Sequence, residues 1–345
     1  MTTQRHPTKA DIMRTILLVI LSAVLTAGAY AQTNAKLAQT GLKFLNVGTD
    51  PRAMAMGEAF TSVEGSSTAL FFNPAGLARF TGSAHAAFGS TQWIAGIDHL
   101  YASAAVNTPD NDYGVFGVTF QSVDYGEIIR TIRTGNAEGW MDAGTFRPTA
   151  MAVGLGYARA LSDRFSIGGR ASYVYQNLGD GVKNVDQFGN PLTNENTVEV
   201  VSFDFGMFYR TGFKSLNFAM SVRNFSKEIK YQKEGFQLPL MFRIGMSIDA
   251  MDFISEAPDA DALLVSVDAT NSRDYPETIN VGAEYLFMRT LAVRAGYMFG
   301  QDEHDVTAGI GVQQTVEGVG IGIDYAYMPF GIFGTVNRFS FQVTL

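Results

Sequence analysis

The chain has 345 residues, of which 46% are hydrophobic and 17% are charged, and its net charge at pH 7 is -8. This composition is too apolar for a disordered chain, and the acidic balance excludes an extended nucleic-acid-binding surface. The absence of cysteine excludes thiol catalysis, disulfide frameworks and cysteine-based zinc sites.

The N-terminus has the order of a secretory signal peptide. Three basic residues precede an apolar run at 16–27, and small residues at 29 and 31 follow it. The run is shorter than the roughly 20 residues that a membrane-spanning helix needs, although an uncleaved anchor is the alternative. We therefore expect a signal peptide over 1–31, cleaved near Ala31, and an exported chain. That chain would either be soluble or cross a membrane as a barrel.

The next segment, residues 32–82, does not alternate like a strand. Pro74 lacks an N–H and has a fixed φ, which suits the first turn of a helix, and Asn73 before it is a good cap. A short helix is therefore predicted to begin at Ala75. The small and flexible side chains at 54–57 would pack well against a barrel wall. Two roles follow for this segment, which we call the hatch: a structural plug, or a gate that moves when ligand or cargo binds.

From residue 83 to 345 the chain shows about fourteen segments in which apolar and polar residues alternate. Period two gives a strand one apolar and one polar face, and segments of about ten residues have the length of membrane strands. Tyr or Phe often ends the apolar face, as in an interfacial aromatic girdle. The clearest segments are 165–176, 201–210, 240–249, 291–299, 319–327 and 338–345.

The connectors between these segments alternate in length. Long connectors are expected near 123–146, 179–197 and 226–236, and short ones at 161–164, 211–215, 288–290 and 315–318. Outer-membrane barrels have this asymmetry, with short periplasmic turns and long outer loops. The long connector near 250–262 and the short link near 94–97 are exceptions. Because recognition usually lies on long loops, partner contacts are expected at 123–146 and 179–197.

Charged residues fall on the polar face, which would line the barrel lumen. A charge facing lipid would cost about 2–4 kcal/mol at mid-membrane, whereas a lumen charge can pair or meet water. These residues would form either a structural ion-pair network or a selectivity path. The candidates are Arg170, Asp204, Arg243, Glu284, Arg294 and Asp324, with Arg210, Arg223, Asp249, Asp268 and Arg338 on the same face.

The hatch and the C-terminal end also resemble a known family. The stretches FLNVG at 44–48, DPRAMAMGEAF at 50–60 and ALFFNPAGLA at 69–78 are similar to the N-terminal signature of PorV/PorQ proteins. The stretch 324–341 resembles the closing strand pair of that family. The resemblance implies a FadL-like barrel of fourteen strands with the hatch folded inside. It also implies a role in type IX secretion, in which such barrels bind exported cargo.

No catalytic signature is present: the chain lacks a phosphate-binding loop with Lys-Ser/Thr, HExxH and GxSxG. We therefore expect an outer-membrane protein that is not an enzyme and has no cofactor and no metal site. Three functions stay open. The first is binding of secreted cargo or secretion machinery, the second is a FadL-like channel for hydrophobic compounds, and the third is a structural barrel. The expected partners are outer-membrane lipid, secreted proteins or secretion components and a hydrophobic ligand, with no nucleic acid.

Overall fold

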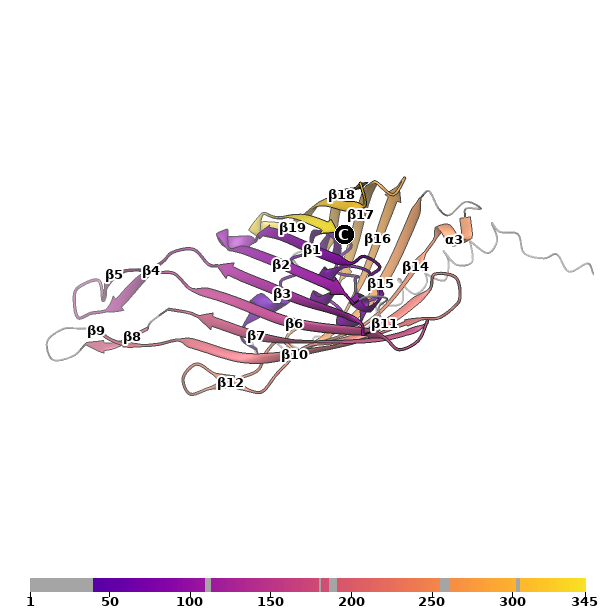
Figure 1. Ribbon diagram of the computed structural model, residues 1–345. Coiled ribbons are helices and arrows are strands. Elements are labelled where there is room, and N and C mark those ends of the chain that lie inside the picture. Colours follow the sequence, from indigo (N-terminus) through magenta and orange to yellow (C-terminus); the bar gives the residue numbers. More distant parts are fainter. Residues whose placement is uncertain (1–39, 109–112, 180, 186–190, 255–260, 302–304) are drawn as a thin grey trace, which may run out of the picture.

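Fourteen strands in the described part of the chain close into one antiparallel barrel, as the alternation predicted (Figure 1). The computed structural model describes residues 40–108, 113–179, 181–185, 191–254, 261–301 and 305–345. The strands pair in chain order, and β20 closes the ring on β1. They are β1 (Ala84–Gln92), β2 (Asp98–Asn107), β3 (Val115–Asp124), β6 (Thr149–Ala160), β7 (Phe165–Asn177), β10 (Thr197–Arg210), β11 (Asn217–Phe225), β14 (Met241–Asp249), β15 (Ala262–Ser272), β16 (Thr278–Phe287), β17 (Leu291–Phe299), β18 (Val306–Val316), β19 (Val319–Pro329) and β20 (Thr335–Thr344).

Three further hairpins lie outside the ring, and all extend the same end of the barrel (Figure 1). We call this the hairpin end and the opposite end the turn end. The hairpins occupy the three long connectors that the sequence predicted. They are β4 (Ile128–Arg133) with β5 (Trp140–Phe146), β8 (Gly181–Val185) with β9 (Pro191–Asn194), and β12 (Ile229–Lys230) with β13 (Gly235–Phe236).

Short helices complete the connections. η4 (Ile94–Gly96) joins β1 to β2, α3 (Met251–Ile254) follows β14, and η6 (Gly331–Phe333) joins β19 to β20. Among the described residues, no helix has the length and hydropathy needed to span a membrane.

The outer wall of the barrel is apolar, and much of its inner wall is polar. In β7 the outward side chains Ile167 and Tyr173 are exposed, whereas Ser166, Arg170 and Ser172 point inward and are buried. The same alternation repeats around the ring. A barrel with an apolar exterior and no free sheet edge satisfies all of its strand hydrogen bonds, which is the condition for crossing a bilayer. Exposed outward side chains include Phe88, Leu100, Phe116, Val118, Leu155, Val201, Phe205, Val293, Ile310, Val312 and Ile323.

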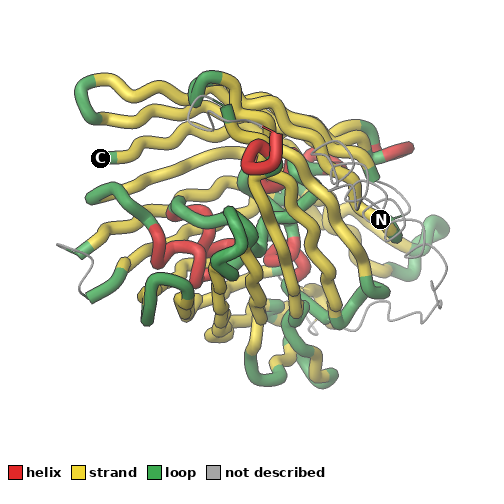
Figure 2. The backbone as a smooth tube through the Cα atoms, turned by 90° about the vertical axis from the view of Figure 1, so that its right-hand side faces the viewer, coloured by secondary structure: helices red, strands yellow, loops and turns green. Residues whose placement is uncertain are grey.

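The described part of the hatch, residues 40–82, lies inside the ring of strands (Figure 2). It begins at the hairpin end, where the Gly41 N–H donates to the Gln237 carbonyl at 3.1 Å. It finishes at the turn end, where the Arg79 guanidinium donates to the Ser162 carbonyl at 2.7 Å. The hatch therefore runs along the length of the barrel. Its helices are η1 (Lys43–Asn46), α2 (Pro51–Ala55), η2 (Ser67–Phe71) and η3 (Pro74–Arg79). The expected signal peptide, 1–31, lies outside the described residues.

Candidate ligand path and hatch

A buried carboxylate on the barrel wall joins the hatch to two strands. Glu284 of β16 accepts from Arg52 of α2 through both carboxylate oxygens, at 2.6 and 2.8 Å. Its neighbour across the ladder, Arg294 of β17, donates to the same carboxylate at 2.5 Å. Arg294 also donates to Asp324 of β19 at 2.5 Å, and Gln342 holds the other oxygen of Asp324. This chain of charge-assisted hydrogen bonds ties the first helix of the hatch to the wall.

Further ion pairs lie elsewhere in the lumen. Arg170 and Asp204 stand opposite each other on β7 and β10 and are paired and buried. Arg243 of β14 pairs with Glu58 of the hatch. Burial alone would raise the pKa of the Glu58 carboxyl, but Arg243, together with Arg223 and Arg338 nearby, outweighs burial and holds that pKa below its ordinary value. Lys43 and Glu64 of the hatch also pair with Asp274 and Arg210, so four ion pairs among the described residues connect the hatch to the barrel.

The structure places all six lumen candidates on the inner wall, and each takes part in an ion pair. Sequence reasoning paired none of them and did not identify their two hatch partners, Arg52 and Glu58. The available signal was weak, because both are charges within otherwise apolar hatch sequence at 51–60. Nothing in their spacing indicates which strand they meet.

The Asn73–Ala75 step has the local structure expected of it, because η3 begins at Pro74 and the Asn73 side chain accepts from the Ala75 N–H at 3.1 Å. The helix is a 3-10 helix. The Asn73 amide also donates to the Thr61 carbonyl at 2.9 Å and to the Met207 carbonyl of β10 at 3.1 Å. One side chain therefore caps a hatch helix, joins two parts of the hatch and binds them to the wall.

Glycines of the wall let the hatch backbone approach closely. At eight positions, a Cβ atom would lie between 1.8 and 2.9 Å from a hatch atom, closer than real Cβ contacts come. At Gly168 it would lie 2.5 Å from the backbone of Pro74, and at Gly296 2.1 Å from the backbone of Gly57. The hatch and the wall therefore pack without room for a side chain between them. The eight positions, here called the glycine belt, are Gly117, Gly156, Gly168, Gly206, Gly245, Gly282, Gly296 and Gly309.

The inner wall changes character at the hairpin end, where it becomes apolar. Phe44 and Leu45 of the hatch pack there against aliphatic side chains from several strands, and all of these residues are buried. The polar atoms nearby are satisfied, since Gln176 bonds to the hydroxyl groups of Tyr125 and Tyr231 at 2.9 and 2.7 Å. We call this group the mouth cluster. It consists of Leu42, Phe44, Leu45, Val123, Ala150, Ala152, Val174, Val198, Val200, Ile229 and Leu238.

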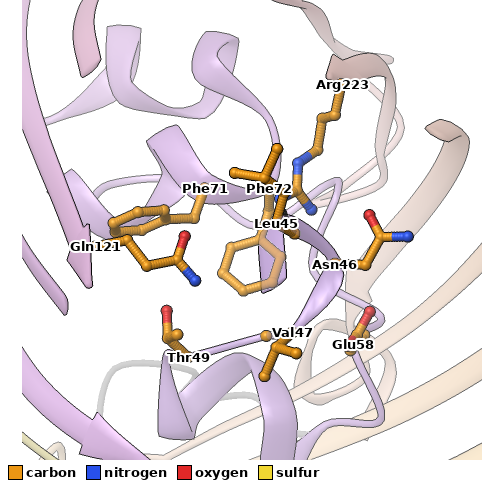
Figure 3. Close-up of a pocket in the computed structure, with 10 residues that line it drawn as sticks. Leu45, Asn46, Val47, Thr49, Glu58, Phe71, Phe72, Gln121 and Arg223 are labelled. Carbon is orange, nitrogen blue, oxygen red and sulfur yellow. Dashed lines mark hydrogen bonds between the residues drawn. The ribbon is translucent and has the colours of Figure 1, made fainter. Parts of the chain in front are cut away.

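A pocket adjoins the mouth cluster between the hatch and the wall (Figure 3). Hatch residues 45–49 form one side and the rings of Phe71 and Phe72 another, while Gln121 of β3 and Arg223 of β11 come from the wall. Its volume is about 10 Å3, room for a single water molecule. Its lining combines the two phenyl rings with the guanidinium of Arg223, the carboxylate of Glu58 and the amides of Asn46 and Gln121.

Solved structures of the same architecture include two toluene transporters and a FadL homologue. The toluene transporter TbuX of Ralstonia pickettii has a TM-score of 0.54 and 12% identity, covering 86% of this chain and 97% of its own. The toluene transporter TodX of Pseudomonas putida has a TM-score of 0.55 and 10% identity, with 84% and 96% covered. A FadL homologue of Pseudomonas aeruginosa has a TM-score of 0.50 and 13% identity, with 86% and 98% covered. The fold is that of the FadL-like barrels.

No protein-family model and no curated protein sequence matches the chain. The structural likeness bears out the FadL-like part of the resemblance seen in the sequence. The relationship to PorV/PorQ proteins and type IX secretion finds no support in these comparisons and stays a prediction. At identities of 10–13% the likeness to the FadL-like barrels concerns the fold, so function must be argued from the residues of this chain.

Proposed function

We propose that this protein is an outer-membrane channel for small hydrophobic compounds, with the hatch as its gate. The observation that carries the proposal is the mouth cluster. A barrel lumen that conducted ions or sugars would be polar at both ends, whereas here the hairpin end is lined with buried Val, Ala, Leu and Ile side chains. Transfer of an apolar compound from lipopolysaccharide or lipid to such a surface would cost little free energy.

Two further points support this proposal over the alternatives. The solved structures of similar fold include toluene transporters, which handle an apolar compound. The pocket next to the mouth cluster is lined by two phenyl rings and lies where a compound would meet the hatch. The proposal assigns the chain no catalytic chemistry, and it takes residues 1–31 as the signal peptide that directs export.

Because the hatch fills the lumen, transport requires it to move, and this can be tested with an introduced disulfide. Ser67 of η2 and Ser103 of β2 are both buried, and their Oγ atoms are 2.7 Å apart. Replacing both with cysteine should allow a bridge between hatch and wall. Since the chain has no cysteine of its own, no other disulfide can form. We expect oxidised S67C/S103C cells to take up labelled toluene no faster than cells without the protein, and reduction to restore uptake.

The single variant S67C, treated with the same oxidant, is the matched control and should keep its uptake. Equal uptake by the oxidised and reduced double variant, with the bridge verified by mass spectrometry, would show that η2 does not move during transport. The proposal that η2 belongs to the gate would then be rejected. Uptake equal to that of cells without the protein in both redox states, with S67C active, would mean that uptake needs Ser103 or at least one of the two serines.

A second candidate function is the binding of secreted proteins, which the PorV/PorQ resemblance implies. The observation that favours it is the apolar surface of the β4–β5 hairpin, where Ile129 is 67% exposed and Trp140 is 50% exposed beyond the barrel. Ile128 and Met141 of the same hairpin are exposed as well, and several large apolar groups exposed together on a projecting loop are typical of contact sites for other proteins.

Deleting the β4–β5 hairpin separates the two functions. If secreted cargo binds there, a variant lacking residues 128–146 should lose exported proteins that co-purify with the wild type in mild detergent. Toluene uptake should be unchanged, because the mouth cluster and the hatch remain. A variant lacking the β8–β9 hairpin, 181–194, tests the second loop in which partner contacts are expected. Identical sets of co-purified proteins from all three forms would exclude the β4–β5 hairpin as the cargo site.

A further inference from the structure

A chain of hydrogen bonds connects the hatch helix η2 to the charged network of the wall. The backbone nitrogen and the hydroxyl oxygen of Ser67 lie 3.3 and 2.7 Å from Nδ1 of His85 on β1. On the other side of the ring, Nε2 of His85 lies 3.3 Å from Oε1 of Gln342 on β20. The Gln342 amide donates to Asp324 at 3.1 Å, and Asp324 is paired with Arg294. His85 is therefore the residue through which η2 contacts this network.

Both ends of this chain fix where the proton of His85 lies. An ionised Asp324 only accepts hydrogen bonds, so the amide nitrogen of Gln342 faces it and the amide oxygen faces His85. Nε2 of the ring must then carry the proton, and Nδ1 is left as an acceptor. The Ser67 N–H requires the same arrangement, because a backbone N–H can only donate. The closed hatch therefore contains neutral His85 with Nδ1 unprotonated.

This unprotonated nitrogen supplies an acceptor that η2 does not obtain from its own cap residue. Ser66, at the N-cap position of η2, makes no side-chain hydrogen bond to the helix. Ser67 and His85 are both buried, so the imidazole takes the place of water as the partner of the Ser67 N–H. The hydroxyl groups of Ser67 and Ser103 of β2 lie 2.7 Å apart and add a second contact with the wall.

Protonation of His85 would break the contact with the helix backbone. An imidazolium carries a proton on both nitrogens, so Nδ1–H would point at the Ser67 N–H, and two donors cannot bond. The Ser67 hydroxyl can turn to accept from Nδ1–H, but the N–H has no such freedom and would be buried without a partner. The closed position of η2 is therefore stable while His85 is neutral, and its stability is lost as the pH falls.

The surroundings of His85 offer no compensation for a positive charge. In the described part of the chain, its hydrogen bonds go to Ser67 and Gln342, which are both neutral. The ring of Phe80 packs edge-on at 5.9 Å. Arg52 of α2 brings positive charge towards the imidazole, and Asp324 lies beyond Gln342. The uncharged neighbours across the two ladders are Ala105 and Thr344. An imidazolium here would gain by reaching water, which requires the hatch to move away.

We propose that His85 is a pH-sensitive latch of the gate, which holds η2 against the wall when neutral and releases it when protonated. The inference rests on the proposed gate and names the condition that moves it. His85 acts through η2 and not on the transported compound, so it is a positioning residue. Its signature is a pH profile that a merely structural contact would not have.

The test measures hydrogen exchange in the full-length purified protein at about pH 8 and about pH 5, on either side of the usual titration range of histidine. Rates are divided by those of an unstructured peptide at the same pH, which removes the intrinsic pH dependence of exchange. We expect protection of residues 67–72 to fall at least about tenfold at the lower pH, because a hydrogen bond to a buried donor is lost, while the strands stay protected. Unchanged protection of 67–72 overturns the proposal.

The variant His85→Asn assigns the effect, because its side-chain oxygen accepts at the place of Nδ1 and does not titrate. It should keep η2 protected at both pH values. Asp50→Asn is the matched control, since Asp50 interacts with Thr68 of η2 and burial raises its pKa, so it also titrates in acid. Asparagine still caps α2. Asp50→Asn and His99→Asn, the latter at a second buried histidine, should respond like the wild type.

A pH response that persists in His85→Asn, or disappears in Asp50→Asn, overturns the assignment to His85. Toluene uptake by cells is measured at both pH values, relative to cells without the protein. We expect the wild type to take up toluene faster at the lower pH and His85→Asn to show no such increase. A pH response of η2 without toluene uptake at either pH would support the latch and reject the channel. Toluene uptake with constant protection of η2 would reject the latch and leave the channel standing.

Discussion

The variant Glu284→Gln should lower the free energy of unfolding by about 3–5 kcal/mol, the cost of removing one partner from a buried ion pair. Glu284 holds Arg52 through two hydrogen bonds and Arg294 through a third. Glutamine keeps the shape but offers no charge and only one acceptor oxygen, so both guanidinium groups would be left partly unsatisfied. Urea unfolding in lipid bilayers, followed by the change in electrophoretic mobility of the folded barrel, measures the effect.

Glu317→Gln is the matched control, because Glu317 is exposed in the turn between β18 and β19. Its unfolding should be unchanged within about 0.5 kcal/mol. If both variants unfold at the same urea concentration, water in the lumen already solvates the ions and the network adds nothing measurable to stability. A loss in Glu284→Gln that Arg52→Gln partly reverses would assign the penalty to the unpaired hatch arginine.

The variant Gly168→Ala should displace the hatch from the wall and cost about 3 kcal/mol, at the upper end of what overpacking causes. The new methyl group would lie 2.5 Å from the Pro74 carbonyl carbon and 2.6 Å from the Ala75 nitrogen. These are backbone atoms at the start of η3, so no rotation of a side chain relieves the clash. Hydrogen exchange should show faster exchange in residues 67–79 while the strands stay protected.

The neighbouring Gly169→Ala is a control on the same strand, since its methyl group would have no atom nearer than 3.5 Å. It should leave exchange in the hatch and stability unchanged. Gly206→Ala gives a second comparison, because its clash, at 1.8 Å, is with the side-chain oxygen of Asn73 and is relieved if that side chain turns away. Equal exchange rates in the hatch of Gly168→Ala and Gly169→Ala would show that the glycine belt does not fix its position.

The wall of the barrel was predictable from the sequence, because a strand with water or protein on one side and lipid on the other must alternate. The segment 165–176 corresponds to β7, and 201–210 lies within β10. Long and short connectors likewise predicted which end carries the hairpins. The start of η3 at Pro74 was predictable for a local reason, since proline and its preceding asparagine act within one helical turn.

The candidate site was predictable only in part. Arg223 could be placed on the lumen face, because the alternation of apolar and polar residues along the strand shows which side chains point inward. That it forms no ion pair with any described residue could not be foreseen, since that depends on which hatch residues lie opposite. Glu58 pairs with Arg243 and Arg52 pairs with Glu284, at sequence separations of 185 and 232 residues. No local pattern encodes such a choice.

By itself, then, the amino-acid sequence determined that this chain forms a barrel of alternating strands with a non-alternating segment ahead of it and charges on the inner face. These properties depend on periods and turns that span only a few residues. Only the tertiary structure decided how the hatch crosses the lumen, which glycines let it touch the wall, and that the lumen is apolar at the hairpin end. Those features arise where distant segments meet, and their energies depend on contacts that exist only after the ring has closed.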